Sequence, residues 1–180
     1  RIREASVDDL GSVVDLWEEL ADHHRELSPM FELADDGREK WSKYLAKKFS
    51  EKSTKLFVAE EDHHLVGFML CMLSPNAPIF KEKTIGLISD VYVKPERRRK
   101  GITKEMLRVA LKWFRKNKCR TVSLSVAAAN VEARAVWGQM GFEPHLIHKR
   151  LDLGGFPANA LLRDRLRPAR GRVVRKKAKK

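Results

Sequence analysis

Residues 88–103 read ISDVYVKPERRRKGIT, and this stretch decides most of what can be said about the fold. Its branched apolar residues up to Val93 are typical of a β-strand, and Pro95 ends the strand because proline lacks an N–H for sheet pairing. Helical spacing of apolar residues begins at Ile102. The glycine and the cations between strand and helix predict a turn that binds phosphate or pyrophosphate, since helix-start amides and arginine side chains both suit such an anion. A solvated basic turn is the alternative on this stretch alone.

A second motif follows one strand later. Its residues, at offsets 0, 3, 7, 11 and 12, are Asn130, Ala133, Trp137, Gly141 and Phe142. Together the two motifs resemble those of the GNAT superfamily of N-acetyltransferases, which carry V-x-P-x-x-[RQ]-x-x-G-x-[GA] before a helix, then a strand, then N-x-x-A-x-x-x-Y-x-x-x-G-F. The resemblance covers residues 2–153 in the order of elements and is specific within residues 88–142.

Hydrophobic periodicity predicts the remaining elements of the chain. We expect strands at 2–5, 56–59, 65–70, 85–93, 121–126 and 142–153, and helices at about 6–27, 41–49, 102–118 and 130–140. The acids at 60–62 fall in a solvated hairpin turn. The order of elements, β-α-α-β-β-β-α-β-α-β, indicates an α/β fold with helices on both faces of a mixed sheet. The GNAT resemblance implies that this sheet is mostly antiparallel and that its central strands splay apart.

The length of 180 residues suits one domain, whose core would bury roughly 70% of the surface of the unfolded chain. Cys71 and Cys119 therefore need not pair. The longest apolar run, residues 65–73, is far shorter than the ~20 residues of a membrane-spanning helix, so we expect no membrane span. The charged residues 1–4 are unlike a signal peptide, and a cytoplasmic location is the default expectation.

Positive charge is concentrated near the C-terminal end of the sequence. The net charge is +13, and residues 163–180 hold ten cations against Asp164 alone, which accounts for +9. We expect an acetyltransferase domain over residues 1–153 and a basic extension over 154–180 that is disordered from about 167, where few large apolar residues remain. Such an extension predicts a weak, salt-sensitive contact with nucleic acid, without sequence selectivity.

The GNAT resemblance implies that the chain uses acetyl-CoA as acyl donor. In that family the backbone of the fourth strand pairs with the pantetheine arm, which here implicates Val91, Tyr92 and Val93. The residues implied at the diphosphate are Arg98, Arg99, Lys100, Gly101, Ile102, Thr103 and Lys104, where Thr103 replaces the usual glycine or alanine. Asn130 is implied to bond the pantetheine arm, and a helix N-cap is its alternative role.

Two positions depart from the usual catalytic groups of the family. Trp137 stands where many members carry a tyrosine acid, and an indole N–H is not an acid near neutral pH, so Trp137 is expected to pack on the cofactor arm or in the core. Ser125 stands where some relatives carry a glutamate base. Asp90 is then the best candidate for the base by its location, and a structural acid is the alternative.

The GNAT resemblance implies an enzyme that transfers an acetyl group from acetyl-CoA to a primary amine, by direct attack in a ternary complex. The acceptor, a protein amine or a small-molecule amine, stays open. The alternative is a non-catalytic module that binds acyl-CoA or associates with nucleic acid. No metal site is expected, because the adjacent pairs His23-His24 and His63-His64 point in different directions and lack matched ligands. Monomer and dimer both stay open.

Overall fold

A computed structural model of the chain describes residues 1–153. The strands are β1 (Ile2–Glu4), β2 (Thr54–Glu61), β3 (His64–Pro75), β4 (Thr84–Val93) and β5 (Val122–Leu124). The α-helices are α1 (Leu10–Leu27), α2 (Gly37–Phe49), α3 (Ile102–Lys116) and α4 (Val131–Gln139). Short 3-10 turns occupy Val7–Asp9, Pro29–Phe31 and Pro95–Arg97. The chain divides into a unit over residues 1–143 and a second unit that begins at Pro144.

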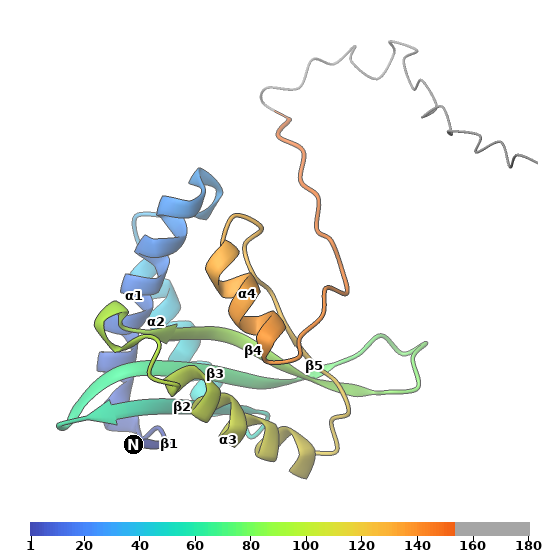
Figure 1. The fold of residues 1–180 in the computed structure, drawn as a ribbon, viewed down its shortest axis with the longest axis horizontal. Coiled ribbons are helices and arrows are strands. Elements are labelled where there is room, and N and C mark those ends of the chain that lie inside the picture. Colours follow the sequence, from blue (N-terminus) through green and yellow to red (C-terminus); the bar gives the residue numbers. More distant parts are fainter. Residues whose placement is uncertain (154–180) are drawn as a thin grey trace, which may run out of the picture. The chain divides into compact units, whose positions relative to one another are not determined.

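The strands form one five-stranded sheet in the order β1-β2-β3-β4-β5 (Figure 1). Neighbours from β1 to β4 pair antiparallel, and β4 pairs with β5 in parallel. The expected mixed, mostly antiparallel α/β sheet is therefore confirmed. The pairing of β3 with β4 shifts register between Leu70 and Cys71, where Ser89 of β4 is the extra residue.

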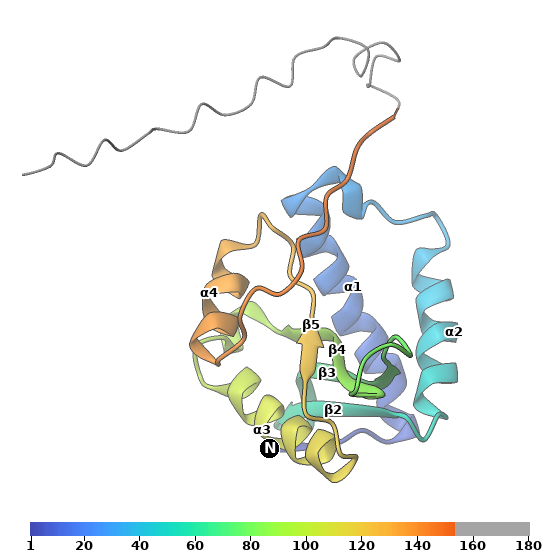
Figure 2. The ribbon, with the colours of Figure 1, turned by 90° about the vertical axis from the view of Figure 1, so that its right-hand side faces the viewer.

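Two helical layers cover the sheet, as the alternation of apolar residues on its strands requires (Figure 2). In β2, Leu56 and Val58 belong to the core under α1 and α2, whereas Phe57 and Ala59 belong to the core under α3. Helices on both faces are thus confirmed. Because β2 and β3 are buried on both sides, they form the centre of the sheet, and β4 lies next to β3.

The first helix starts and ends where the sequence indicates. The Ser6 backbone N–H donates to Asp9 Oδ2 at 2.6 Å, and the Arg3 guanidinium donates to the same carboxylate at 2.7 Å. These hydrogen bonds, that of Arg3 above all, hold the pKa of Asp9 well below its usual range. The helix ends at Leu27, directly before Ser28 and Pro29.

Two expectations from the sequence are wrong. Residues 144–153 form no strand, and their Leu146 and Ile147 side chains are 75% and 83% exposed. Strand conformation depends on hydrogen bonds to a neighbouring strand, and these adjacent apolar residues do not alternate as in a half-buried strand. The acids 60 and 61 lie in β2 and pair with Arg3 and Arg97, because the hairpin turn is confined to Asp62 and His63 with φ of 48° and 63°.

Two smaller expectations concern cysteines and membrane spans. Cys71 and Cys119 are both free and buried, and burial raises the pKa of each thiol. Within residues 1–153, no helix combines the length and the apolar character needed to cross a bilayer. The basic extension predicted over 154–180 lies outside the described residues.

Candidate active site

β4 and β5 separate after a short parallel contact. They pair only over Gly86–Ile88 and Val122–Leu124, whereas β4 continues to Val93 (Figure 1). After β5 the chain leaves the sheet and enters α4. The part of β4 beyond Ile88 therefore has a neighbouring strand on one side only, which is the splaying that the GNAT resemblance implied.

Backbone alternation determines which groups of β4 lie at this open edge. The Lys94 N–H donates to the Val66 carbonyl of β3 at 2.9 Å. At two-residue steps, the backbone groups of Tyr92 and Asp90 face β3 as well, and those of Val91 and Val93 face the open edge. The Arg98 side chain donates from Nε to the Val93 carbonyl at 3.1 Å, which leaves the Val93 N–H and both polar groups of Val91 available to a ligand.

The turn after β4 exposes backbone amides at the start of α3. Arg99 and Gly101 have positive φ, 61° and 78°, and the first helical hydrogen bond joins the Glu105 N–H to the Gly101 carbonyl at 3.0 Å. The N–H groups of residues 102–104 therefore precede the helical hydrogen-bonding pattern. A Cβ at Gly101 would meet no atom within 4 Å, so there is open space beside these amides. This is an arrangement that binds anions.

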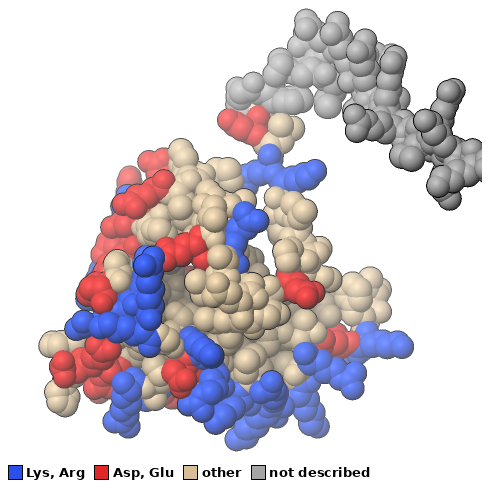
Figure 3. Space-filling view, in the orientation of Figure 1, with Lys and Arg blue, Asp and Glu red and all other residues tan. Residues whose placement is uncertain are grey.

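The cations of this turn divide into two groups. Arg98 folds back onto β4, where its guanidinium lies 5.8 Å from the centre of the Tyr92 ring. The Arg99 side chain is 91% exposed and its Nη2 lies 4.0 Å from Glu132 Oε1 of α4. Lys100 and Lys104 are also exposed, and lysine and arginine side chains gather along the α3 side of the molecule (Figure 3). Arg98 thus supports the strand end, whereas Arg99, Lys100 and Lys104 are exposed near the start of α3.

Asn130 and Trp137 both have structural roles in α4. Asn130 Oδ1 accepts from the Ala133 N–H at 2.9 Å, which is the N-cap interaction. No hydrogen bond within residues 1–153 engages its Nδ2. Trp137 is 6% exposed and packs edge-on against Phe142, with 5.2 Å between ring centres. Of the two alternatives for Trp137, the structure shows core packing, and Gly141 ends the helix at φ 90° as expected.

Asp90 lies two residues beyond the last β4–β5 pair, on the face of β4 that α1 covers. Its carboxylate is half-buried and accepts from Ser89 Oγ at 2.6 Å. Burial raises the pKa of Asp90 above its usual range, although the Ser89 hydroxyl, the His24 ring and the Trp17 side chain each act to lower it. Burial also lowers the pKa of His24, and the neighbouring His23 lowers it further, while Asp90 acts to raise it.

Comparison with known proteins decides the family. The family model described as the acetyltransferase (GNAT) family matches residues 15–142, which include the open strand edge, the basic turn and α4. The chain belongs to the acetyltransferase (GNAT) family. It is therefore an acetyl-CoA-dependent N-acetyltransferase, as the sequence resemblance implied, and it transfers acetyl groups to an amine.

Individual proteins are similar to this chain in sequence or in fold. The chain is 25% identical over 142 residues to the uncharacterized N-acetyltransferase YhfO of Bacillus subtilis, covering 79% of this chain and 89% of that protein. Its fold is similar to that of a predicted acetyltransferase from Clostridium acetobutylicum solved with acetyl-CoA, with TM-score 0.71, 20% identity and coverage of 85% and 96%. The aminoglycoside 6'-N-acetyltransferase AAC(6')-IG of Acinetobacter haemolyticus gives TM-score 0.65, 20% identity and coverage of 84% and 99%.

Tyr92 does not replace the tyrosine acid that many GNAT members carry in α4. Its hydroxyl lies on the α1 side and donates to Glu19 Oε2 at 3.0 Å. Burial and the Glu19 carboxylate raise the pKa of Tyr92 to about 12. Glu19 also lies 3.7 Å from the Lys94 ammonium, so this carboxylate holds the end of β4 against α1.

Trp17 and His24 were missed as neighbours of Asp90. The sequence could indicate only that these two residues share a face of α1. Trp17, Leu20, Ala21 and His24 recur at three- and four-residue steps, which places them on one side of the helix. The sequence does not indicate that this face covers Asp90, since the crossing of α1 over β4 depends on tertiary packing.

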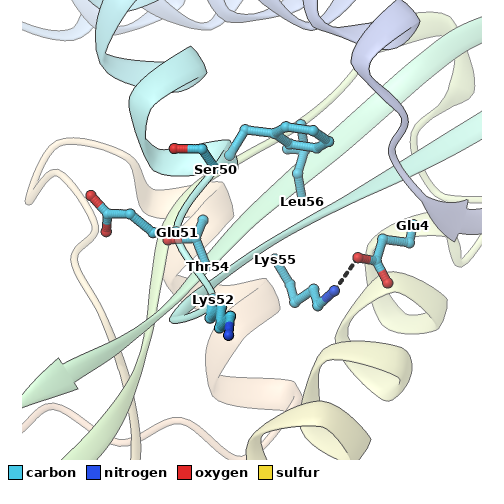
Figure 4. Close-up of a pocket in the computed structure, with 8 residues that line it drawn as sticks. Glu4, Ser50, Glu51, Lys52, Thr54, Lys55 and Leu56 are labelled. Atoms are coloured by element: carbon cyan, nitrogen blue, oxygen red, sulfur yellow. Dashed lines mark hydrogen bonds and ion pairs between the residues drawn. The ribbon is translucent and has the colours of Figure 1, made fainter.

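A cavity elsewhere in the molecule contains none of the expected site residues. It has a volume of about 220 Å³ and lies between the end of α2 and the start of β2 (Figure 4). Its lining residues are Glu4, Phe49, Ser50, Glu51, Lys52, Thr54, Lys55 and Leu56. Lys55 and Glu4 form an ion pair across it, and within residues 1–153 the buried Thr54 hydroxyl has no hydrogen-bond partner. The cavity is not part of the GNAT site.

Proposed function

We propose that acetyl-CoA lies along the open edge of β4 with its diphosphate at the start of α3. This proposal rests on one observation. The unpaired backbone groups of Val91 and Val93 at the end of β4 are followed, one turn later in the chain, by the unpaired amides of residues 102–104. Arg99, Lys100 and Lys104 supply positive charge, and the space beside Gly101 admits a bulky anion. The Nδ2 group of Asn130 is a further donor for the pantetheine arm.

Asp90 would accept the proton of the attacking amine. A primary ammonium has a pKa of about 10.4, so it must lose a proton before its nitrogen can attack. Asp90 stands where β4 leaves β5, and its raised pKa makes it a better proton acceptor than an exposed aspartate. Proton transfer from the ammonium to this carboxylate leaves a neutral amine and a protonated Asp90.

Acetyl-CoA supplies a thioester carbonyl carbon for this amine to attack in a ternary complex. As the C–N bond forms and the C–S bond breaks, the sulfur takes the electron pair. Trp137 is buried in the core and Tyr92 is held by Glu19, so neither supports a role as acid toward that sulfur. A thiol pKa of about 8.5 makes thiolate an adequate leaving group, and water can protonate it afterwards.

The acceptor would be a primary amine that approaches from the side of α1 and α2 as a cation. Residues 10–39 contain nine acids and two bases, and acidic side chains gather over α1 (Figure 3). A negative field raises the local concentration of a cationic substrate. This supports amines with positive charge, whether on a protein or on a small molecule, without distinguishing between them.

The test is turnover of acetyl-CoA by the full chain with lysine peptides, spermidine and an aminoglycoside, read as thiol release and as product mass. We expect release to depend on the amine, and Asp90→Asn to lower kcat/KM by about a hundredfold or more while leaving acetyl-CoA affinity within a few-fold. Asp62→Asn, which removes an exposed acid in the β2–β3 turn outside residues 10–39, is the matched control. Binding of acetyl-CoA without release for any amine would favour the non-catalytic acyl-CoA-binding module instead.

A further inference from the structure

The two sides of α3 differ sharply in chemistry. Met106, Ala110 and Phe114 on one side are buried in the core under the sheet. The other side presents five exposed cations, which we call the α3 basic face: Lys104, Arg108, Lys112, Arg115 and Lys116. With 3.6 residues per turn, these five positions fall within an arc of about 120° around the helix. They therefore form one continuous positive surface.

The charge of this surface is largely uncompensated. Residues 97–120 contain eleven lysines and arginines and a single acid, Glu105, which accepts from Arg108 Nη2 at 2.8 Å. Within residues 1–153, Lys112, Arg115 and Lys116 form no ion pair. Figure 3 shows lysine and arginine side chains gathered along this side of the molecule. The helix dipole favours cations in the last turn, but it does not account for Lys112 in the turn before.

The residue types on the α3 basic face indicate which polyanion fits it. No large apolar side chain is exposed within residues 97–120. Insertion into a lipid headgroup region needs exposed apolar side chains, and the centre of a protein interface is enriched in apolar and aromatic residues. Unpaired bases need aromatic rings to stack on, whereas Trp113 packs against the core. The phosphate backbone of a double helix requires only lysine and arginine.

The length of the face also suits a double helix. Lys104 and Lys116 are twelve residues apart in α3, which at 1.5 Å per residue corresponds to roughly 18 Å. A duplex carries one phosphate charge per ~1.7 Å of its axis, so about ten charges lie along that length. Phosphates therefore outnumber the cations, and each cation can contact one.

We propose that the α3 basic face binds the phosphate backbone of double-stranded nucleic acid. Contacts to phosphate alone carry no sequence information, so the binding has no sequence preference. It is separate from acetyl transfer, because Lys112, Arg115 and Lys116 lie beyond the residues proposed to hold acetyl-CoA. A few phosphate contacts alone bind weakly, so binding is measured on the full chain, in which residues 163–180 add ten cations.

The test is the affinity of the full chain for a labelled duplex DNA of about 20 base pairs, measured by fluorescence anisotropy from about 50 to 200 mM salt. Lys112→Glu and Lys116→Glu should each weaken binding about fivefold or more at the lowest salt. Each should also reduce the slope of log affinity against log salt by about 0.9, because one phosphate contact is lost. Lys47→Glu is the matched control, since Lys47 is an exposed lysine of α2 without an ion pair within residues 1–153. It changes the net charge equally and should alter the affinity less than twofold.

A variant that strengthens binding excludes misfolding as the cause. Glu105→Gln removes the acid of the α3 basic face and releases Arg108, so it should raise DNA affinity about two- to threefold. The affinity for acetyl-CoA should stay within twofold in Lys112→Glu and Lys116→Glu, which checks their fold.

Three results would overturn the proposal. The first is that the full chain does not bind the duplex. The second is that Lys47→Glu weakens binding as much as Lys112→Glu, which would show an effect of net charge alone. The third is that Lys112→Glu weakens binding to phosphatidylserine vesicles or to polyglutamate and leaves DNA binding unchanged, which would assign the face to a membrane or to an acidic protein.

Discussion

The two sides of β4 would contribute to the proposed site by different means. Toward α3 the chain offers backbone groups: the open edge at Val91 and Val93 and the amides of residues 102–104. Toward α1 it offers side chains, namely Asp90, which hydrogen-bonds Ser89, and Tyr92, which hydrogen-bonds Glu19. A site formed by backbone groups requires glycine and proline at fixed positions, and it can therefore be recognised as a motif in the sequence. A site made of side chains depends on how helices pack and leaves little in a single sequence.

The largest effect is expected at Trp137, which tests whether this residue serves packing or chemistry. Truncation of a buried aromatic typically costs about 3–5 kcal/mol, so Trp137→Ala should lower the free energy of unfolding by that amount. Trp137→Phe keeps a ring against Phe142 and serves as the control in denaturant titrations. A Trp137→Phe protein with full stability and acetyl-CoA affinity but no turnover would assign the indole a chemical role.

Gly101 tests the backbone character of the α3 side. A Cβ meets no atom within 4 Å at either Gly101 or Gly11, but only Gly101 has a positive φ, 78°. Gly101→Ala should therefore cost about 1–2 kcal/mol in unfolding experiments. Gly11→Ala, within α1, should instead stabilise the protein by about 0.5–1 kcal/mol. Equal effects of the two substitutions would contradict the special conformation at Gly101.

Acetyl-CoA affinity should separate the two substitutions as well. Gly101→Val places a branched side chain in the space proposed for the diphosphate and should weaken binding in calorimetry more than removal of any one arginine, because neighbouring cations partly replace a lost charge. Gly11→Ala should leave the affinity unchanged. Undiminished affinity of Gly101→Val would show that the diphosphate lies elsewhere.

Arg98 and Arg99 divide the basic turn by role and should differ in salt dependence. Arg99→Ala removes an exposed cation beside the α3 amides and should weaken acetyl-CoA binding by about two- to fivefold at low salt, an effect that added salt reduces. Arg98→Ala removes a hydrogen bond to the Val93 carbonyl and should cost about 1 kcal/mol of stability. Calorimetry of acetyl-CoA binding at two salt concentrations checks this difference. Equal changes of affinity with salt in the two variants would contradict the separate roles of Arg98 and Arg99.

The smallest effect is expected from removal of residues 154–180. Both sides of β4 lie within residues 1–143, so acetylation of a small amine should be nearly unchanged. Weak binding of nucleic acid should disappear with this segment and should fall steeply with salt in the intact chain. Nucleic-acid affinity that persists in the truncated protein would contradict the role predicted for the basic extension.

The sequence predicted the fold well wherever local signals are strong. Ser28-Pro29 marks the end of α1, Pro95 the end of β4 and Gly141 the end of α4, because each residue restricts the backbone locally. The strand expected over 142–153 failed because a strand also needs a partner, which no local pattern specifies.

Within the proposed site, the sequence indicated the basic turn and named Asp90, whose catalytic role stays a prediction, but it did not indicate what surrounds them. The inward fold of Arg98 and the burial of Asp90 under α1 depend on how the turn and α1 pack on β4. The capping role of Asn130 is local and was foreseen as an alternative. Side-chain neighbours from distant segments were therefore the part that one sequence could not supply.

The central claim is that acetyl-CoA is held mainly by backbone groups on the open side of β4. The most direct measurement is residue-resolved amide hydrogen exchange with and without acetyl-CoA. We predict new protection at Val91, Val93 and residues 102–104, and little change at Asp90 and Tyr92, whose amides already face β3. Binding that protects none of the amides at the open edge or at the start of α3 would contradict the account.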